Sequence, residues 1–363
     1  FVVLDTVAQR LWLVRDPFGI KPLYFTRSAS SFWFASEISA LVDAGVTSRT
    51  IDPQGLYDFL HSARVDHRAE SMVQGVNQLL PGQIASLDLD AGPSTALDVR
   101  TYWRPPTERE DRPFAEVVTD LGHHFRRSVQ SHLRSDVAVG AALSGGIDSS
   151  AILCSMREEL GPDAKIHAFS YLAEDPRYDE EQWIDMAAER AGAVVHKIRI
   201  QADQLREEAS DLIRSQGEPF GSTSIFAQRC VFRSAHDAGV TVLLDGQGAD
   251  ELFGGYRGYL AGSFADLVRS GRLVKAAQLA AKVARRPDVS IGRRELARVA
   301  AKLLPGAAAD ALLKRAGLGP FPTWLDQTWF LNHGVSGLST PSTLGLDDAL
   351  VSAFASTSLP SLL

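Results

Sequence analysis

The first hundred residues alternate between short apolar runs and turns, which is typical of β-strands. Runs rich in β-branched and aromatic residues occupy positions 1–4, 11–14, 23–26 and 32–35. An Asp-Pro-Phe-Gly turn at 16–19 separates the second run from the third. Asp52 and Pro53 supply the N-cap and the first residue of a helix, and a Pro-Gly turn at 81–82 precedes another strand at 83–89. The pattern predicts a β-rich domain over residues 1–105.

A charged, proline-rich stretch at 106–113 interrupts this pattern and predicts an interdomain linker. Continuous apolar runs then alternate with amphipathic segments. We expect strands at 137–143, 166–171, 194–200 and 240–244, and helices at 114–134, 149–160, 179–191, 202–214 and 224–238. Such alternation predicts a parallel sheet with helices on both faces, whose ligands bind beyond the carboxyl ends of the strands. Beyond position 256 the spacing is helical, so residues 114–363 are expected to form an α/β domain with a helical C-terminal part.

Composition narrows the classes of function. The chain has 363 residues, which suits two domains, and 45% of them are hydrophobic, as in globular proteins. A net charge of -7 argues against a general nucleic-acid binder. We find no signal peptide and no apolar run long enough to cross a bilayer, so we expect a cytoplasmic protein with no membrane partner. Cys154 and Cys230 lie in apolar, helix-like stretches and are expected to be buried thiols in a reducing compartment.

The string SGGIDSS at 144–150 follows a predicted strand and has the features of an anion site. Gly145 and Gly146 allow a tight turn that points backbone N–H groups at a ligand, and a helix opening at Ser149 adds its dipole. Asp148 is compatible with bound phosphates only if a cation lies between them, which predicts Mg²⁺. The loop lacks the Gly-Lys-Ser/Thr ending of a Walker A motif. The alternative is a glycine-rich turn that caps a helix for structural reasons.

A second string, VLLDGQGADELFGGY at 242–256, also begins with a predicted strand and continues through a glycine-rich loop. Asp250 and Glu251 stand at a predicted helix start, where acidic residues also compensate the helix dipole. If both loops end strands of one sheet, Asp148 and Asp250 form a Mg²⁺ pair for ATP. This prediction requires the two carboxylates to be close enough to share one ion.

These motifs together resemble one enzyme family. The strings at 144–150 and 246–256 resemble the synthetase domain of glutamine-hydrolysing asparagine synthetases. RDPFGIKPLY at 15–24, FASE at 34–37, LPG at 80–82 and Tyr102-Trp103 resemble the second half of that family's glutaminase domain. The resemblance covers essentially the whole chain. It implies an α/β protein: a β-rich remnant of an Ntn-type αββα glutaminase domain, then a parallel-sheet ATP-pyrophosphatase domain (PP-loop, HUP-like) with a helical C-terminal part.

The resemblance also implies a reaction and its participants. In the family, the glutaminase half releases ammonia from glutamine. The synthetase half uses ATP and Mg²⁺ to convert aspartate to β-aspartyl-AMP, and ammonia then displaces AMP to give asparagine. The implied cofactors are ATP and Mg²⁺, and the implied partners are aspartate with glutamine or ammonia, without nucleic acid or membrane; a homodimer is compatible. The family's nucleophilic Cys would lie before residue 1 and its synthetase Lys after residue 363, so we expect a fragment lacking both termini.

Carried over by resemblance, the site residues fall into three groups. The metal ligands are Asp148 and Asp250, and the catalytic residues are Gln247 and Asp250. The nucleotide-binding residues are Ala142, Leu143, Ser144, Gly145, Gly146, Asp148, Ser149, Tyr171, Asp245 and Gly246. The loop at 218–224 resembles the family's loop near the acceptor substrate, although a polar loop with proline is also an ordinary helix connector.

Two positions depart from the family pattern. Gln247 stands where many members have Glu, and Asp245 stands where many have Ser. An amide forms hydrogen bonds but cannot act as a base. Two alternatives therefore stay open: an ATP-dependent amide-forming cyclase, similar to β-lactam or macrolactam synthetases, with a non-aspartate acceptor, or a non-catalytic nucleotide-binding module.

Overall fold

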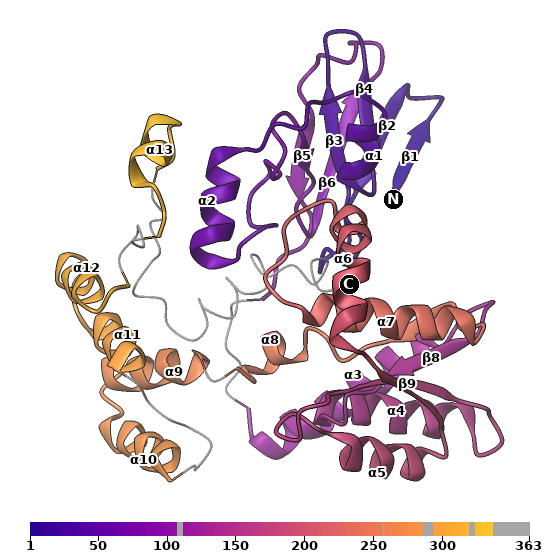
Figure 1. Cartoon of the computed structure of the whole chain (residues 1–363), viewed down its shortest axis with the longest axis vertical. Coiled ribbons are helices and arrows are strands. Elements are labelled where there is room, and N and C mark those ends of the chain that lie inside the picture. Colours follow the sequence, from indigo (N-terminus) through magenta and orange to yellow (C-terminus); the bar gives the residue numbers. More distant parts are fainter. Residues whose placement is uncertain (107–111, 257, 286–292, 319–323, 337–363) are drawn as a thin grey trace. The chain divides into compact units, whose positions relative to one another are not determined.

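The computed structural model describes residues 1–106, 112–256, 258–285, 293–318 and 324–336 (Figure 1). The chain forms two compact units. Among the described residues, unit 1 contains 1–106, 217–219 and those from Asp250 onward, and unit 2 contains 112–216 and 220–249. The first predicted half of the chain thus lies entirely in unit 1, and the described residues from Asp250 onward, which belong to the second predicted half, group with it. The domain bounds at 105 and 114 stay a prediction.

Two antiparallel sheets form the β-rich part of unit 1. The first has the order β1-β2-β6-β7, with bounds Val2–Asp5, Arg10–Val14, Gln83–Asp88 and Asp98–Thr101. The second has the order β4-β3-β5, with bounds Phe32–Ala35, Tyr24–Arg27 and Asn77–Gln78. Leu13 and Ala85 of the first sheet share a buried cluster with Phe25 of the second. Two sheets packed through alternating apolar residues agree with the expected glutaminase remnant.

Short helices complete the layers of unit 1. Helix α1 (Ile38–Asp43) buries Ile38 and Leu41 in a cluster with Tyr24 of β3. Helix α2 (Pro53–Ser62) begins as predicted, because the Asp52 carboxylate accepts the Gly55 N–H at 2.7 Å.

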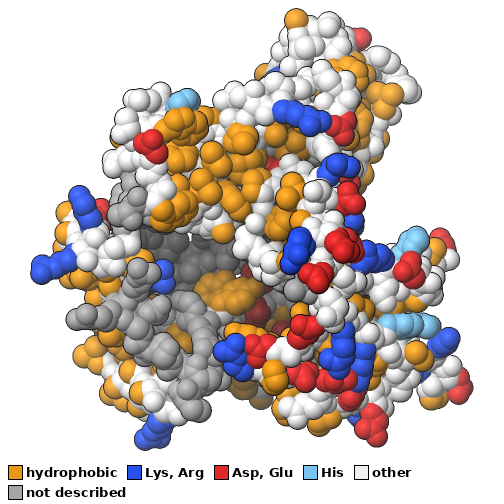
Figure 2. Space-filling model, viewed as in Figure 1, with side chains coloured by type: hydrophobic (Ala, Val, Ile, Leu, Met, Phe, Trp, Pro, Cys, Tyr) orange, Lys and Arg blue, Asp and Glu red, His pale blue; other side chains and the backbone are white. Residues whose placement is uncertain are grey.

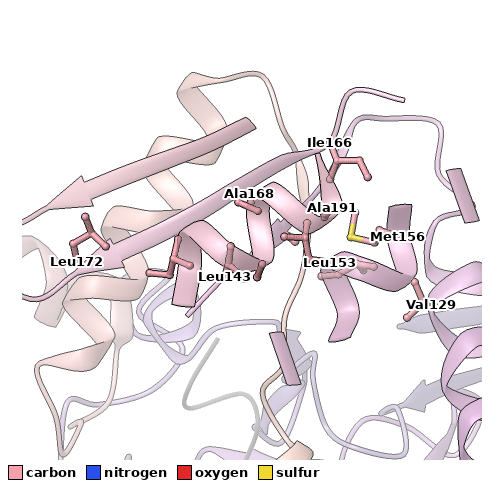
Figure 3. Packing of buried hydrophobic residues seen from close by; sticks show 13 residues of the cluster. Val129, Leu143, Leu153, Met156, Ile166, Ala168, Leu172 and Ala191 are labelled. Atoms are coloured by element: carbon pink, nitrogen blue, oxygen red, sulfur yellow. The ribbon is translucent and has the colours of Figure 1, made fainter. Parts of the chain in front are cut away.

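Unit 2 is a parallel α/β layer structure. Its sheet has the order β10-β9-β8-β11, with bounds Val194–Arg199, His167–Leu172, Val139–Ala142 and Val242–Leu244. Its helices are α3 (Phe114–His132), α4 (Ile147–Leu160), α5 (Glu181–Ala191), α6 (Ala202–Gln216) and α7 (Ser224–Asp237). The main core lies between the sheet and α3 to α5, where Leu153 and Met156 are fully buried (Figure 3). Val231 and Ala235 of α7 cover the opposite face.

The chain beyond unit 2 is helical where it is described, as predicted. The helices are α8 (Ala249–Phe253), α9 (Gly258–Arg269), α10 (Leu273–Ala284), α11 (Arg293–Leu303), α12 (Gly306–Arg315) and α13 (Gln327–Asn332). In the described ranges, none of the helices has the length and apolar character needed to cross a membrane.

The structure shows how charged side chains are distributed on one face of unit 2 and how far the two cysteines are buried. On the face shown in Figure 2, Lys and Arg side chains of unit 2 lie among Asp and Glu side chains, and Lys197 and Arg199 both pair with Glu181. Cys230 is buried as predicted, but Cys154 is only partly buried, because it lies on α4 beside the fully covered Leu153 and not on its inner face. Both thiols are free.

Candidate functional site

The loop after β8 is shaped by close packing against the start of α5. The Leu143 N–H donates to the Phe169 carbonyl oxygen at 2.9 Å and continues the sheet by one residue. Gly145 has φ +80°, and a Cβ placed there would lie 3.0 Å from Cβ of Trp183 and 3.3 Å from the Glu180 carbonyl oxygen. Both the left-handed backbone and the lack of space require glycine at this position. The structure therefore contains the tight turn that the sequence predicted.

Helix α4 begins two residues earlier than predicted, at Ile147, and Gly146 is its N-cap. Gly146 provides no side-chain cap, so the N–H groups of the first helical turn are left for a ligand or solvent. Ser149 lies inside the first turn, 5% exposed, and its hydroxyl accepts the Ser144 N–H at 3.2 Å. The hydroxyl of Ser144 lies 3.1 Å from that of Ser149 and accepts the Gly146 N–H at 3.3 Å. The two serines hold the loop in shape and leave the helix end open to an anion.

The loop after β11 is built around the side chain of Asp245. Its Oδ1 accepts the Gln247 N–H at 3.2 Å. Burial raises the pKa of Asp245, while hydrogen bonds from the Gln247 and Gly246 backbone and from the Gln228 side chain act in the opposite direction. Gln247 itself is exposed. The acidic side chain of this loop is therefore held in place at position 245, and the exposed position 247 carries an amide.

The two glycine-rich loops meet in unit 2. Strands β8 and β11 are parallel neighbours, and the chain passes from β8 to β9 and β10 on one side before it returns to β11 on the other. The order of the strands thus reverses between β8 and β11, which is where open α/β sheets bind ligands. A Cβ placed on Gly246 would lie 3.2 Å from Cβ of Asp148 and 3.2 Å from the Ser149 nitrogen. The structure therefore brings the second motif onto the first turn of α4.

The residues predicted to flank adenine lie at the same edge of the sheet. Ala142 is the last residue of β8 and pairs with Phe169 of β9. Tyr171 is near the carboxyl end of β9 and is 40% exposed. Both positions are open to a ligand that occupies the end of the sheet, and their roles remain proposals.

Asp250 belongs to unit 1, whereas Asp148 belongs to unit 2. Their sharing of one ion therefore stays a prediction. Within the described residues no group of three or more His, Cys, Asp or Glu side chains forms a ready metal cluster. Mg²⁺ in ATP sites is commonly held by one or two carboxylates together with phosphate oxygens, so this donor set fits the ion. Next to Asp250, the buried Oε2 of Glu251 has no hydrogen-bond partner among the described residues, which leaves an acidic oxygen in need of a donor or a cation.

Sequence reasoning missed the role of Glu218. Residues 217–219 group with unit 1, although the chain on both sides of them belongs to unit 2. Oε2 of Glu218 accepts the Tyr24 hydroxyl at 2.9 Å, and Oε1 accepts the Met72 N–H at 3.2 Å. Burial, with a contribution from the charge of Asp66, raises the pKa of Glu218 to about 7. This carboxylate is hydrogen-bonded inside unit 1, and a role of the 218–224 loop near the acceptor substrate stays a prediction.

A buried arginine organises the same part of unit 1. Arg15 is 1% exposed and donates to Oε1 of Gln78 and to the carbonyl oxygens of Leu79 and Gly19. Its Nε and the Oδ1 of Asp66 are buried without hydrogen-bond partners among the described residues. The available signal was the RDPFGIKPLY string, in which Arg15 and Tyr24 lie at the two ends of a turn that joins two apolar strands.

Comparison with known proteins agrees with this architecture. A family model described as asparagine synthase matches residues 120–328, and one described as a glutamine amidotransferase domain matches residues 1–103. Asparagine synthetase [glutamine-hydrolyzing] 3 of Bacillus subtilis (strain 168) is 28% identical over 268 residues, which are 70% of this chain and 43% of that protein. Asparagine synthetase [glutamine-hydrolyzing] 1 of the same strain is 32% identical over 263 residues, 71% of this chain and 39% of that protein.

A protein named amidase chyE, from Penicillium rubens, is 25% identical over 281 residues, 72% of this chain and 40% of that protein. The chain thus spans about two fifths of the length of the curated relatives it matches.

Proposed function

Because this chain belongs to the asparagine synthase family, we propose that it is the ATP-using part of an enzyme that amidates the side chain of aspartate. The nitrogen comes from glutamine as ammonia, and the β-rich half is a piece of the domain that releases it. The proposal rests on one observation above all. Gly246, in the loop after β11, packs against Asp148 and Ser149 at the start of α4, so both glycine-rich loops border one place at the end of the sheet.

The chemistry explains why such an enzyme needs a phosphate site. A carboxylate is a poor electrophile until one of its oxygens becomes part of a good leaving group. An oxygen of the aspartate side chain attacks the α-phosphorus of ATP, and pyrophosphate leaves. Ammonia then attacks the acyl carbon of β-aspartyl-AMP, the C–O bond to AMP breaks, and the nitrogen loses a proton to give asparagine. Exclusion of water from the site protects the acyl-adenylate from hydrolysis.

Each group of site residues has its own role in this reaction. The Gly145 N–H and the uncapped N–H groups at the start of α4 bind phosphate oxygens, while Ser144, Gly146 and Ser149 hold the loop in shape through their own hydrogen bonds. Ala142 and Tyr171 flank the adenine. Asp148 and Asp250 hold Mg²⁺, which neutralises phosphate charge when bound. Gln247 donates and accepts hydrogen bonds near the acyl group but cannot remove its proton.

An ATP–pyrophosphate exchange assay on the full-length protein tests the proposal. We expect Mg²⁺-dependent exchange that requires aspartate, because adenylation of the carboxylate is reversible before ammonia attacks. Asp148→Asn should abolish most of the exchange, and Asp136→Asn, a change in an exposed loop before β8, serves as its matched control. If neither aspartate nor any carboxylate in a panel supports exchange, the protein binds nucleotide without catalysing adenylation.

Two observations favour a second acceptor for the same chemistry. Position 245 carries Asp and position 247 carries Gln, which departs from the family pattern, and one relative is named an amidase. The same exchange assay separates the two cases: exchange with another carboxylate and none with aspartate indicates an amide-forming cyclase.

The remaining assignments are also proposals. We infer domain bounds at 1–105 and 114–363 with a linker at 106–113, a cytoplasmic location and a homodimer. Limited proteolysis of the full-length protein tests the linker, and light scattering of the same sample tests the dimer.

A further inference from the structure

The chain after α8 folds back onto the acidic residues of that helix. The Gly255 N–H donates to the carbonyl oxygen of Asp250 at 2.9 Å, which closes a turn at the end of α8. A Cβ placed on Gly255 would collide with Oδ1 of Asp250 and would lie 2.8 Å from its Cγ. Only glycine at position 255 therefore leaves the Asp250 carboxylate in its place.

The next residue fixes the second acid. The Tyr256 hydroxyl donates to Oε1 of Glu251 at 2.9 Å, and Glu251 is 4% exposed. Oε2 of Glu251 remains without a partner among the described residues.

Helix α8 has five residues, too few to hold its side chains in place by its own hydrogen bonds. The carboxylates of Asp250 and Glu251 consequently depend on the Gly-Tyr pair that follows. Ligands that are fixed before the ion arrives lose less conformational freedom when they bind it, and loss of a group that fixes a ligand typically lowers metal affinity by about 10–100-fold.

We propose that Gly255 and Tyr256 are positioning residues for a divalent-cation site on α8: Gly255 leaves room for the Asp250 carboxylate, and Tyr256 anchors Glu251 beside it. The inference rests on the proposed function in that it takes Mg²⁺·ATP as the ligand. Neither Gly255 nor Tyr256 touches the ion, and each acts through the position of one carboxylate.

The test is a Mg²⁺ titration of ATP binding, measured by equilibrium dialysis of labelled ATP against the full-length protein. We expect Tyr256→Phe, which removes one hydroxyl, to raise the Mg²⁺ concentration for half-maximal binding about tenfold, the usual effect of losing an outer-shell partner. Gly255→Ala should raise it at least as much. ATP binding in EDTA and the melting temperature without ligand should stay near wild type for Tyr256→Phe. Tyr259→Phe is the matched control. The Tyr259 ring lies 6.0 Å from the Tyr256 ring, but the hydroxyl that donates to Glu251 is that of Tyr256.

Three outcomes overturn the inference, and they differ from one another. Wild-type binding that ignores Mg²⁺ removes the metal from the proposed function and the inference with it. Mg²⁺-dependent wild-type binding with unchanged titrations for both variants leaves the function intact and refutes only the positioning role. A fall in ATP binding in EDTA that matches a fall in melting temperature shows a purely structural role for this turn.

Discussion

Replacement of Glu218 by Gln should remove a loss of folding stability that the wild type shows as the pH rises from acidic to neutral. The Glu218 carboxylate lies in unit 1 between the Tyr24 hydroxyl and the Met72 N–H, and its pKa is raised to about 7. Glutamine has nearly the same shape, can accept the Met72 N–H through its oxygen, and carries no charge at any pH.

The size of the effect follows from the pKa. A group whose pKa rises from 4.5 in the unfolded chain to about 7 in the folded one binds its proton more tightly in the folded state. Folding stability therefore falls as the pH rises through this window, because the ionised carboxylate is less well accommodated in the folded protein. At about 1.36 kcal/mol per pH unit, the loss approaches roughly 3 kcal/mol above pH 7. Below pH 4.5 both states are protonated and the group contributes no pH dependence.

Urea unfolding of the wild type and the Glu218→Gln variant, at intervals between pH 4.5 and 8, measures this directly. All other titrating groups are common to both proteins, so the difference in unfolding free energy isolates Glu218. The unfolding free energy of the variant minus that of the wild type should increase by most of the roughly 3 kcal/mol between pH 4.5 and pH 8. Parallel stability curves would refute the reasoning, since they would mean that the carboxyl keeps its ordinary pKa in the fold.

Substitution of two residues near Glu218 should shift its pKa in opposite directions, which provides two controls. The charge of Asp66 raises the pKa of Glu218, so Asp66→Asn should move the titration to lower pH. The Tyr24 hydroxyl bond lowers the same pKa, so Tyr24→Phe should move the titration to higher pH. Shifts in the same direction for both variants would point to a general loosening of the site.

Three further predictions concern unit 2 and α8. Gly246→Ala should lower ATP affinity about tenfold or more with little change in melting temperature, because its methyl group would press on Asp148 and on the Ser149 nitrogen; calorimetric titration with ATP measures this. Asp250→Asn should weaken Mg²⁺·ATP binding without unfolding the protein; a large drop in melting temperature with unchanged ATP binding would show instead that this residue is only a helix cap. Leu153→Ala should destabilise the protein by about 2–5 kcal/mol in urea, because Leu153 is completely buried in the main core of unit 2; a loss under 1 kcal/mol would contradict that placement.

The sequence predicted the elements whose residues carry strong local signals. The strand at 32–35 has the bounds expected from its apolar residues, and the Asp-Pro start of α2 forms the expected cap. The alternation of apolar runs and amphipathic segments predicted the parallel sheet of unit 2, because a strand buried on both faces must be apolar throughout. Three elements were missed: α1, β5 and β7. The last is exposed at all four residues and forms only because β6 offers it a partner.

The candidate site divides in the same way. The glycines, serines and acids of the two loops could be recognised in sequence, because tight turns and helix starts demand those residue types locally. The sequence could not show that Gly246 rests on Asp148, or that the α4 helix begins at Ile147 with Ser149 used to brace the loop. These facts depend on how the two strands lie beside each other.

By itself, the sequence determined most of the strands and helices and the chemistry available at each loop, because these follow from backbone preferences and hydrophobic spacing over a few residues. Only the tertiary structure decided that Glu218 is buried beside Tyr24, and that Tyr256 anchors Glu251 while Gly255 makes room for Asp250. The physical reason is that a side chain's partner, burial and pKa are set by atoms packed around it, and for Glu218 the decisive atoms stand far away along the chain.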